Sequence, residues 1–216
     1  MKINVLLIIS ILSISAGSFA QSSSEPTNKL LSAALTKHLV QQDDFCIGKF
    51  NWPIDISAND IEAGSKDAIQ LPVLEKLGLV SSSSGSVMRK EDGENEVVVS
   101  VKRYSLTDEG KKYYLVKNMP SLAANGKTVV HQGDICVAKL SLDKVVRWDQ
   151  PKIVNNQQET IATYTYKVNA VDWVKKPEVQ AVFPMVARVV NGAGTLQLQQ
   201  RMRLINKNWV AVNPWE

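Results

Sequence analysis

The positions of apolar residues along the chain predict helices and strands in alternation. Between residues 28 and 42 they recur at the i, i+3, i+4 and i+7 spacing of an amphipathic helix. A second helical stretch covers 65–80, where Pro72 is expected to begin a new helix because proline is tolerated in a first turn. The polar turn that contains Asp92-Gly93 is typical of a β-hairpin. The strands that flank it are predicted at 80–88 and 97–106.

The second half of the chain predicts an antiparallel sheet with a helix packed on one face. Residues 172–190 have helical spacing in two pieces, and Pro177 and Pro184 fall where a first turn is expected. Alternating or short apolar runs predict strands at 135–148, 160–168, 195–204 and 209–212. This order of elements is typical of an α+β fold.

A domain boundary is predicted from a change in composition. Residues 121–133 are rich in small and polar side chains, which predicts a linker. The linker divides the mature chain into an N-terminal part, 21–120, and a C-terminal part, 134–216. We therefore expect two small α+β parts, a number that suits the length of the chain.

The first twenty residues have the pattern of a secretory signal peptide. Lys2 supplies the charge, 3–14 is a nearly continuous apolar run, and Ser18-Phe19-Ala20 places small residues where signal peptidase cuts. The run is shorter than the roughly 20 apolar residues that span a bilayer. No cysteine near the cut could carry a lipid. We expect cleavage after Ala20 and a periplasmic or secreted protein without stable membrane insertion.

The chain has two cysteines, Cys46 and Cys136, each within an apolar run. An even number in an exported chain favours a disulfide. The bond would close a loop of about 90 residues, worth about 4–5 kcal/mol in the chain-entropy model. The alternative is two separate buried thiols. The spacing fits neither a Cys-x-x-Cys redox pair nor a zinc site, so no metal is expected.

The charge is mildly basic. The formal net charge of +4 becomes +3 when Lys2 leaves with the signal peptide. Such a charge suits weak attraction to anionic envelope surfaces and lies far below that of a typical nucleic-acid binder.

One stretch resembles a known fold family. The segments 74–80, Leu-Glu-Lys-Leu-Gly-Leu-Val, and 104–113, Tyr-Ser-Leu-Thr-Asp-Glu-Gly-Lys-Lys-Tyr, look like the winged helix of bacterial transcriptional regulators. In that family the first segment ends the recognition helix, a hairpin forms the wing, and Leu-Thr-x-x-Gly opens the next helix, here at 108–115. The likeness covers 71–115 and implies a winged-helix-like N-terminal part. Residues 136–212 also look like domains of secreted bacterial proteins, a likeness that implies no activity.

Charges in the winged-helix-like segment argue against nucleic acid as a partner. Phosphate backbones attract clustered Lys and Arg. Lysines in the expected recognition helix are balanced by acids in the same helix. The wing tip holds Arg89 and Lys90 against four acids, Glu91, Asp92, Glu94 and Glu96.

Residues that commonly perform catalysis occur without the spacing that catalysis requires. The serines at 81–84 lack a nucleophile-elbow context, and His38 and His131 stand apart. The adjacent acids Asp43-Asp44 and Asp108-Glu109 precede a strand and cap a helix. No catalytic residue, cofactor or metal is therefore predicted.

Aromatic and basic residues in the C-terminal part provide a candidate interaction surface. Trp and Tyr anchor many protein interfaces, and Trp215 near the chain end is the aromatic residue most expected to be exposed. Basic residues expected around it are Lys175, Lys176, Arg201 and Arg203. The predicted function is an exported, non-enzymatic envelope protein that binds an unknown protein or envelope polymer. The alternatives are a cell-wall hydrolase, a hydrolase inhibitor, and a DNA-binding regulator whose signal peptide is misassigned.

Overall fold

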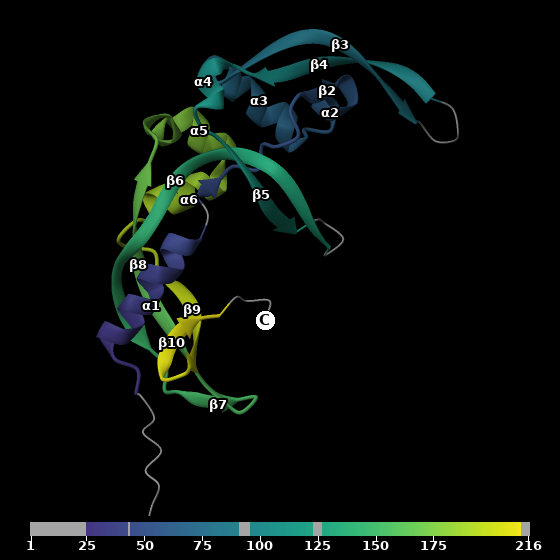
Figure 1. The fold of residues 1–216 in the computed structure, drawn as a ribbon. Helices are drawn as coiled ribbons and strands as arrows, with labels where there is room; N and C mark the ends of the chain where they lie inside the picture. Colours follow the sequence, from purple (N-terminus) through teal and green to yellow (C-terminus); the bar gives the residue numbers. More distant parts are fainter. Residues whose placement is uncertain (1–24, 43, 91–95, 123–126, 213–216) are drawn as a thin grey trace, which may run out of the picture.

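A computed structural model describes residues 25–42, 44–90, 96–122 and 127–212. The fold is mixed α and β with antiparallel pairing between its strands, as the α+β prediction requires at this coarser level (Figure 1). The predicted signal peptide lies outside the described residues.

The larger sheet is built along one long strand, β6 (Thr128–Trp148). Its first part pairs with β5, its middle with β1, and its second part with β8. Beyond β8 the order continues through β9 and β10, while the short β7 pairs with the start of β8. The bounds are β1 Phe45–Cys46, β5 Tyr114–Leu122, β7 Lys152–Val154, β8 Gln157–Ala170, β9 Leu198–Ile205 and β10 Asn208–Ala211.

The smaller sheet has the order β2–β4–β3 and lies with two helices at one end of the molecule (Figure 1). A capping box at Ser57 begins the first helix, Ser65 caps the second, and Thr107 caps the short α4. The bounds are β2 Ile54–Ser57, α2 Ala58–Glu62, α3 Lys66–Lys76, β3 Val80–Lys90, β4 Glu96–Leu106 and α4 Asp108–Lys111.

Two hydrophobic clusters hold the chain together. The first joins residues of the smaller sheet and α3, such as Leu71 and Tyr104, to Ile135 of β6 and Val179 of α5. It also includes residues of η1 (Asp172–Lys175) and α6 (Pro184–Asn191), which flank α5 (Pro177–Val182). Proline stands first in both α5 and α6, which confirms that prediction.

The second cluster covers the larger sheet with the first helix of the chain. Helix α1 (Asn28–Gln41) buries Leu31, Leu35 and Leu39, which repeat every four residues along one face. They belong to one cluster with residues of β6, β8, β9 and β10, including Val145, Tyr166 and Trp209. The main helix on the larger sheet is thus α1, whereas the prediction placed a C-terminal helix there and α1 in the N-terminal part.

Part of the predicted linker forms a strand. Thr128–Gly133 form the first residues of β6 and pair with β5, so small and polar side chains here belong to a hairpin. The first cluster also contains residues from both sides of the predicted boundary. Composition does not separate this strand from a linker, because a hairpin that projects from the body also contains polar residues and glycine.

Pro72 does not begin a new helix. It lies inside α3, which continues without a break from Lys66 to Lys76. Proline leaves one helical carbonyl without its usual donor. The helix still continues because Leu71 and Leu74, on either side of Pro72, are both fully buried in the first cluster.

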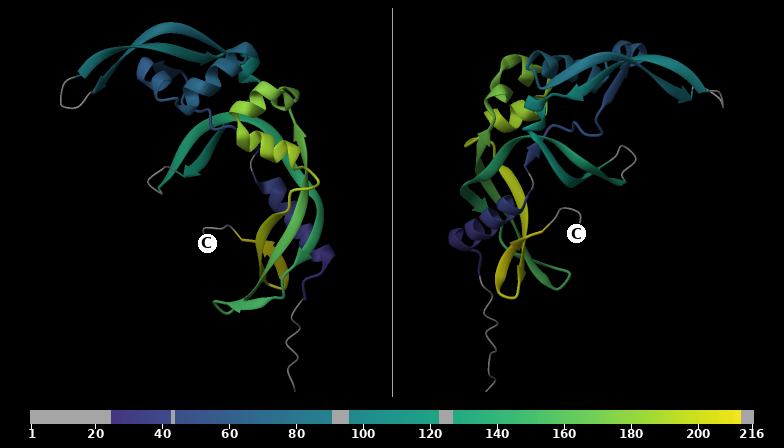
Figure 2. Two further views of the ribbon diagram at one scale, coloured as in Figure 1. Left: turned by 180° about the vertical axis from the view of Figure 1, so that it is seen from behind. Right: turned by 45° about the horizontal axis from the view of Figure 1, so that its top comes forward.

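Two hairpins project from the body on the same side (Figures 1 and 2). We call the β3–β4 hairpin the upper arm, and β5 with the paired start of β6, Thr128–Ile135, the lower arm. The upper arm is in full antiparallel register from Val80↔Leu106 to Lys90↔Glu96. The body between the arms and β7 curves, so the molecule has a concave side (Figure 1).

We expect Gly110→Ala to lower the free energy of unfolding by about 2–3 kcal/mol, because a Cβ at Gly110 would lie 1.9 Å from the Leu79 carbonyl oxygen. That oxygen also accepts the Thr107 N–H at the base of the upper arm. Urea unfolding measures the change. The control is Gly85→Ala, whose nearest neighbour would be 3.6 Å away and which should change stability by less than about 1 kcal/mol. Equal losses in the two variants would contradict the prediction.

Candidate functional site

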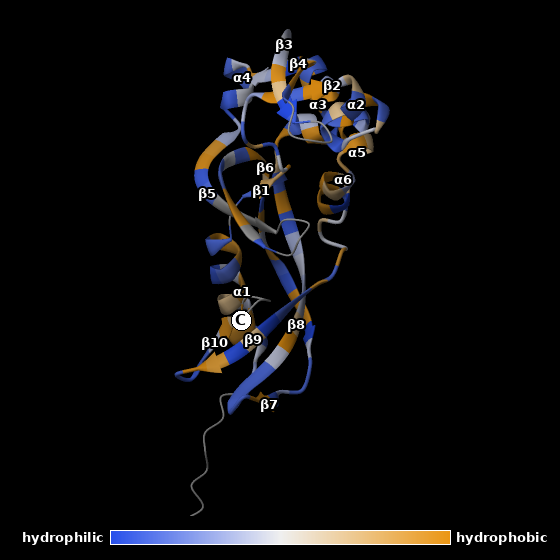
Figure 3. Ribbon diagram, turned by 90° about the vertical axis from the view of Figure 1, so that its right-hand side faces the viewer, coloured by the Kyte–Doolittle hydropathy of each residue, from blue (hydrophilic) through white to orange (hydrophobic). Residues whose placement is uncertain are grey.

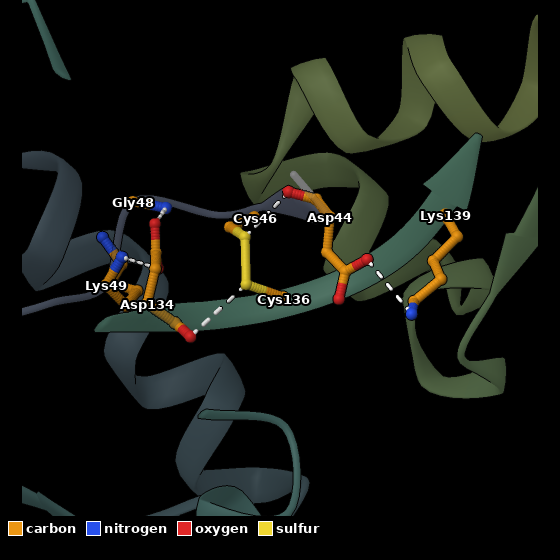
Figure 4. Close-up of a disulfide and its surroundings, with 7 residues drawn as sticks. All are labelled: Asp44, Cys46, Gly48, Lys49, Asp134, Cys136 and Lys139. Carbon is orange, nitrogen blue, oxygen red and sulfur yellow. Dashed lines mark hydrogen bonds and ion pairs between the residues drawn. A yellow bond between two sulfur atoms is a disulfide. The ribbon is translucent and has the colours of Figure 1, made fainter. Parts of the chain in front are cut away.

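A disulfide between Cys46 and Cys136 joins β1 to β6 just after the lower arm ends, and it confirms the predicted pairing (Figure 4). The two cysteines are register partners on β1 and β6. β1 is only two residues long. The covalent bond therefore holds in place a strand that backbone hydrogen bonds alone would hold weakly.

Asp134 forms the second attachment of the same segment to β6. Its carboxylate accepts the N–H of Gly48 at 2.9 Å and the N–H of Lys49 at 2.7 Å (Figure 4). Gly48 has φ +74°, the left-handed conformation that glycine adopts without strain, and this turns the two successive N–H groups toward one acceptor. Asp134 is 8% exposed, and this burial raises the pKa of its carboxyl group.

Lys49 links this segment to α3. It is 3% exposed, and its ammonium pairs with the carboxylate of Asp67 in the first turn of α3. Its backbone carbonyl accepts the indole N–H of Trp52 at 3.1 Å. We call Cys46, Cys136, Gly48, Lys49 and Asp134 the junction. Through it, residues 44–52 connect the larger sheet to the helices of the smaller one.

Basic side chains of the upper arm are paired with acids. Arg103 of β4 donates two hydrogen bonds to Asp55 of β2, at 2.7 and 2.8 Å. Those hydrogen bonds lower the pKa of the Asp55 carboxyl group. Lys102, on the same strand, forms an ion pair with Glu75 of α3 at 3.0 Å. The pairs leave the upper arm with little unbalanced positive charge.

Both arms expose apolar side chains. Met88 and Val98 are cross-strand partners on the upper arm, and Val98 is 71% exposed. On the lower arm Val116 is 79% exposed and Val130 is exposed as well. Apolar residues recur along β5 and β6 in Figure 3. Contiguous exposed apolar patches mark interaction sites, whereas single exposed apolar side chains are common on any protein surface.

The predicted interaction residues are not brought together. Lys175 pairs with Asp172 in η1, after the end of β8, and Lys176 is exposed next to it. Arg201 and Arg203 lie on β9 opposite Ile161 and Glu159, near the start of β8. These two pairs of basic residues therefore lie near opposite ends of one strand. Trp215 lies outside the described residues.

Arg203 has a structural partner that the sequence did not indicate. It donates a hydrogen bond to Glu159 at 2.7 Å, and the two side chains are 20% and 8% exposed. Arg203 and Glu159 are register partners on β9 and β8. Their pairing depends on strand register between segments 44 residues apart, which no local pattern reveals. The guanidinium of Arg203 is therefore used in a contact within the larger sheet.

Both histidines have side-chain partners. His131 stacks on Phe50, with ring centroids 3.4 Å apart. His38 is within hydrogen-bonding distance of Gln42, and partial burial lowers the pKa of its imidazole. Within the described ranges, no group of three or more His, Cys, Asp or Glu could hold a metal ion. No described helix is long and apolar enough to cross a membrane.

Comparisons with known proteins do not place the chain in a family. No protein-family model matches it, and neither curated proteins nor solved structures provide a match. The junction and the arms are therefore the basis of a functional interpretation.

We expect Cys46→Ser and Cys136→Ser each to lower the free energy of unfolding by about 2–5 kcal/mol, because either change opens the same loop. The double variant should add little to a single one. Urea unfolding with and without reductant measures this, since reduction should bring the natural protein down to the level of the variants. Additive losses would mean that the two cysteines stabilise the fold independently.

Asp134→Asn should cost about 1–3 kcal/mol, because the amide nitrogen cannot accept a backbone N–H, whereas each oxygen of the carboxyl group accepts one, with or without a proton on the group. The matched control is Asp44→Asn, which removes the exposed Lys139 pair of the same segment and should cost less than about 1 kcal/mol. Urea unfolding of the two variants compares these losses.

The loss in Asp134→Asn should also depend on pH. The raised pKa of Asp134 makes the folded state hold its proton at a pH where the unfolded state has released it. The contribution of Asp134 to the free energy of unfolding is greatest at pH values below the ordinary pKa near 4. It decreases as the pH rises through the pKa of the folded state. The deficit of the variant should therefore be largest near pH 4 and smaller at pH 7. A deficit that grows with pH would contradict this expectation.

Proposed function

We propose that this chain is an exported, non-enzymatic binding protein of the bacterial envelope that holds a partner protein between its two arms. The observation that carries the proposal is the pair of hairpins that project on one side with exposed apolar residues such as Val98 and Val116 (Figures 1 and 2). Neither Val98 nor Val116 belongs to a hydrophobic cluster of the described residues, so neither side chain stabilises the core. A partner would bury these side chains and gain the apolar contact.

Free strand edges favour a protein over a polymer as the partner. Among the described residues β3 pairs with β4 alone, and β5 pairs with β6 alone. Each arm therefore offers backbone N–H and C=O groups along its outer edge. An extended segment of another protein can add to such an edge by main-chain hydrogen bonds.

Charge pairing supports a partner other than nucleic acid. Arg103, Lys102 and Arg89 each face an acid of the same region, namely Asp55, Glu75 and Asp60. Binding a phosphate backbone would require breaking these pairs to free the cations. The DNA-binding, hydrolase and hydrolase-inhibitor alternatives stay predictions.

The winged-helix comparison belongs to the same proposal. What supports it is the order of elements, in which α3 precedes the β3–β4 hairpin and α4 follows, with β2 as a third strand. We propose that the family's wing corresponds to the upper arm and serves here as a protein-binding element. The exported location rests on the signal-peptide pattern, and the disulfide is compatible with an oxidising compartment.

The test places a photo-crosslinking amino acid at Val98, at Val116, or at Val40 of α1 in the exported protein. Val40 is the matched control because it is a valine with 78% exposure, away from both arms. Crosslinking in the periplasm should give the same partner adduct from both arm positions and none from Val40. The crosslinked chain should begin at Gln21.

A second measurement separates binding from folding. Val98→Asp and Val116→Asp should each reduce the adduct several-fold without changing the melting temperature, and Val40→Asp should leave it unchanged. Absence of any adduct from both arm positions, or equal adducts from all three, would overturn the proposed function.

A further inference from the structure

A cavity of about 560 Å³ lies beside the junction, on the side of α3 and α6. Ligand pockets of this size are commonly lined by apolar side chains with a few polar groups that orient the ligand. The apolar part of this lining comes from β1, the segment that follows it, and the start of α6. Those residues are Phe45, Ile47, Phe183, Pro184, Met185 and Val186.

The charged part of the lining has one unbalanced cation. Lys49 is buried and paired with Asp67. Lys66, in the first turn of α3, also lines the cavity and makes no ion pair with the described residues. Asp134 does not line the cavity, and its carboxylate accepts backbone N–H groups instead. The wall therefore carries two ammonium groups and one carboxylate.

Two contacts made by lining residues hold the walls in place. Gln70 of α3 donates a hydrogen bond to the Val182 carbonyl at 2.7 Å, which joins α3 to the end of α5 just before α6. The disulfide holds Cys46, on the opposite wall, against β6. Because both walls are fixed, a ligand would enter a formed space without a large ordering cost.

We infer that this cavity binds a small molecule with an apolar chain and a single carboxylate, such as a straight-chain fatty acid. The carboxylate would lie at the α3 end, where Lys66 donates to it beside the Lys49–Asp67 ion pair, which carries no net charge. The chain would lie against Phe183, Met185 and Val186. The net positive charge of the lining would repel a cationic amphiphile. A neutral amphiphile would form no ion pair with Lys66.

The experiment compares three soluble probes with the same chain length in the mature protein: octanoate, octan-1-ol and octylammonium. Isothermal titration calorimetry below the micelle concentrations should give the tightest binding for octanoate. Octan-1-ol should bind at least about tenfold more weakly, because it lacks the charge-assisted hydrogen bond. Added salt should weaken the binding of octanoate more than that of octan-1-ol.

Variants on α3 and α6 locate the site. Lys66→Gln should weaken octanoate binding about three- to tenfold and leave octan-1-ol unchanged. Lys76→Gln, at the other end of α3, is the matched control and should change neither. Met185→Asp, at an exposed position of the lining, should abolish octanoate binding by repulsion while the melting temperature stays unchanged.

The outcomes separate this inference from the proposed function. Octanoate binding should persist in Val98→Asp and Val116→Asp, since the arms do not line the cavity. Equal binding of octanoate and octan-1-ol would overturn the inference. So would equal effects of Lys66→Gln and Lys76→Gln, or no detectable binding of octanoate to the natural protein.

Discussion

The rest of the structure depends on the attachment of residues 44–52 to β6. This segment leaves the larger sheet as the two-residue β1 and continues to β2 of the smaller sheet, with few backbone hydrogen bonds of its own. The Cys46–Cys136 bond and the Asp134 carboxylate hold its two halves against the middle of β6. One bond is covalent and the other is a buried, charge-assisted contact, so the segment keeps one conformation without a regular ladder.

That attachment determines where the arms and the cavity lie. β6 supplies one strand of the lower arm, the middle of the junction, and the strand that pairs with β8. The segment that ends at β2 carries the smaller sheet and therefore the upper arm. The cavity is bounded by the same segment, with Lys49 reaching from it to α3. We therefore expect a substitution in the junction to affect the upper arm, the lower arm and the cavity.

Local signals predicted much of the secondary structure but little of the candidate site. The strands that flank Asp92-Gly93 pair in antiparallel register, and Pro177 and Pro184 each begin a helix, because these signals act over a few residues. The helix expected at 108–115 is shorter, since α4 ends at Lys111 and β5 begins at Tyr114. The prediction that Pro72 begins a new helix was wrong, because the packing of Leu71 and Leu74 outweighed the preference of proline for a first turn. The sequence did not show that Lys175 and Arg203 lie near opposite ends of β8, because their separation depends on strand pairing.

The amino-acid sequence alone indicated the α+β class and the coarse order of elements in the second half, and it favoured a disulfide between the two cysteines over separate thiols. These follow from periodicity, turn residues and an even cysteine count, which are properties of short segments or of composition. Tertiary structure decided that α1 covers the larger sheet and that Arg203 pairs with Glu159. It also brought Lys66 and Met185 to one cavity. Those contacts join residues far apart in the chain, and only the pairing of strands and the packing of helices bring them within reach.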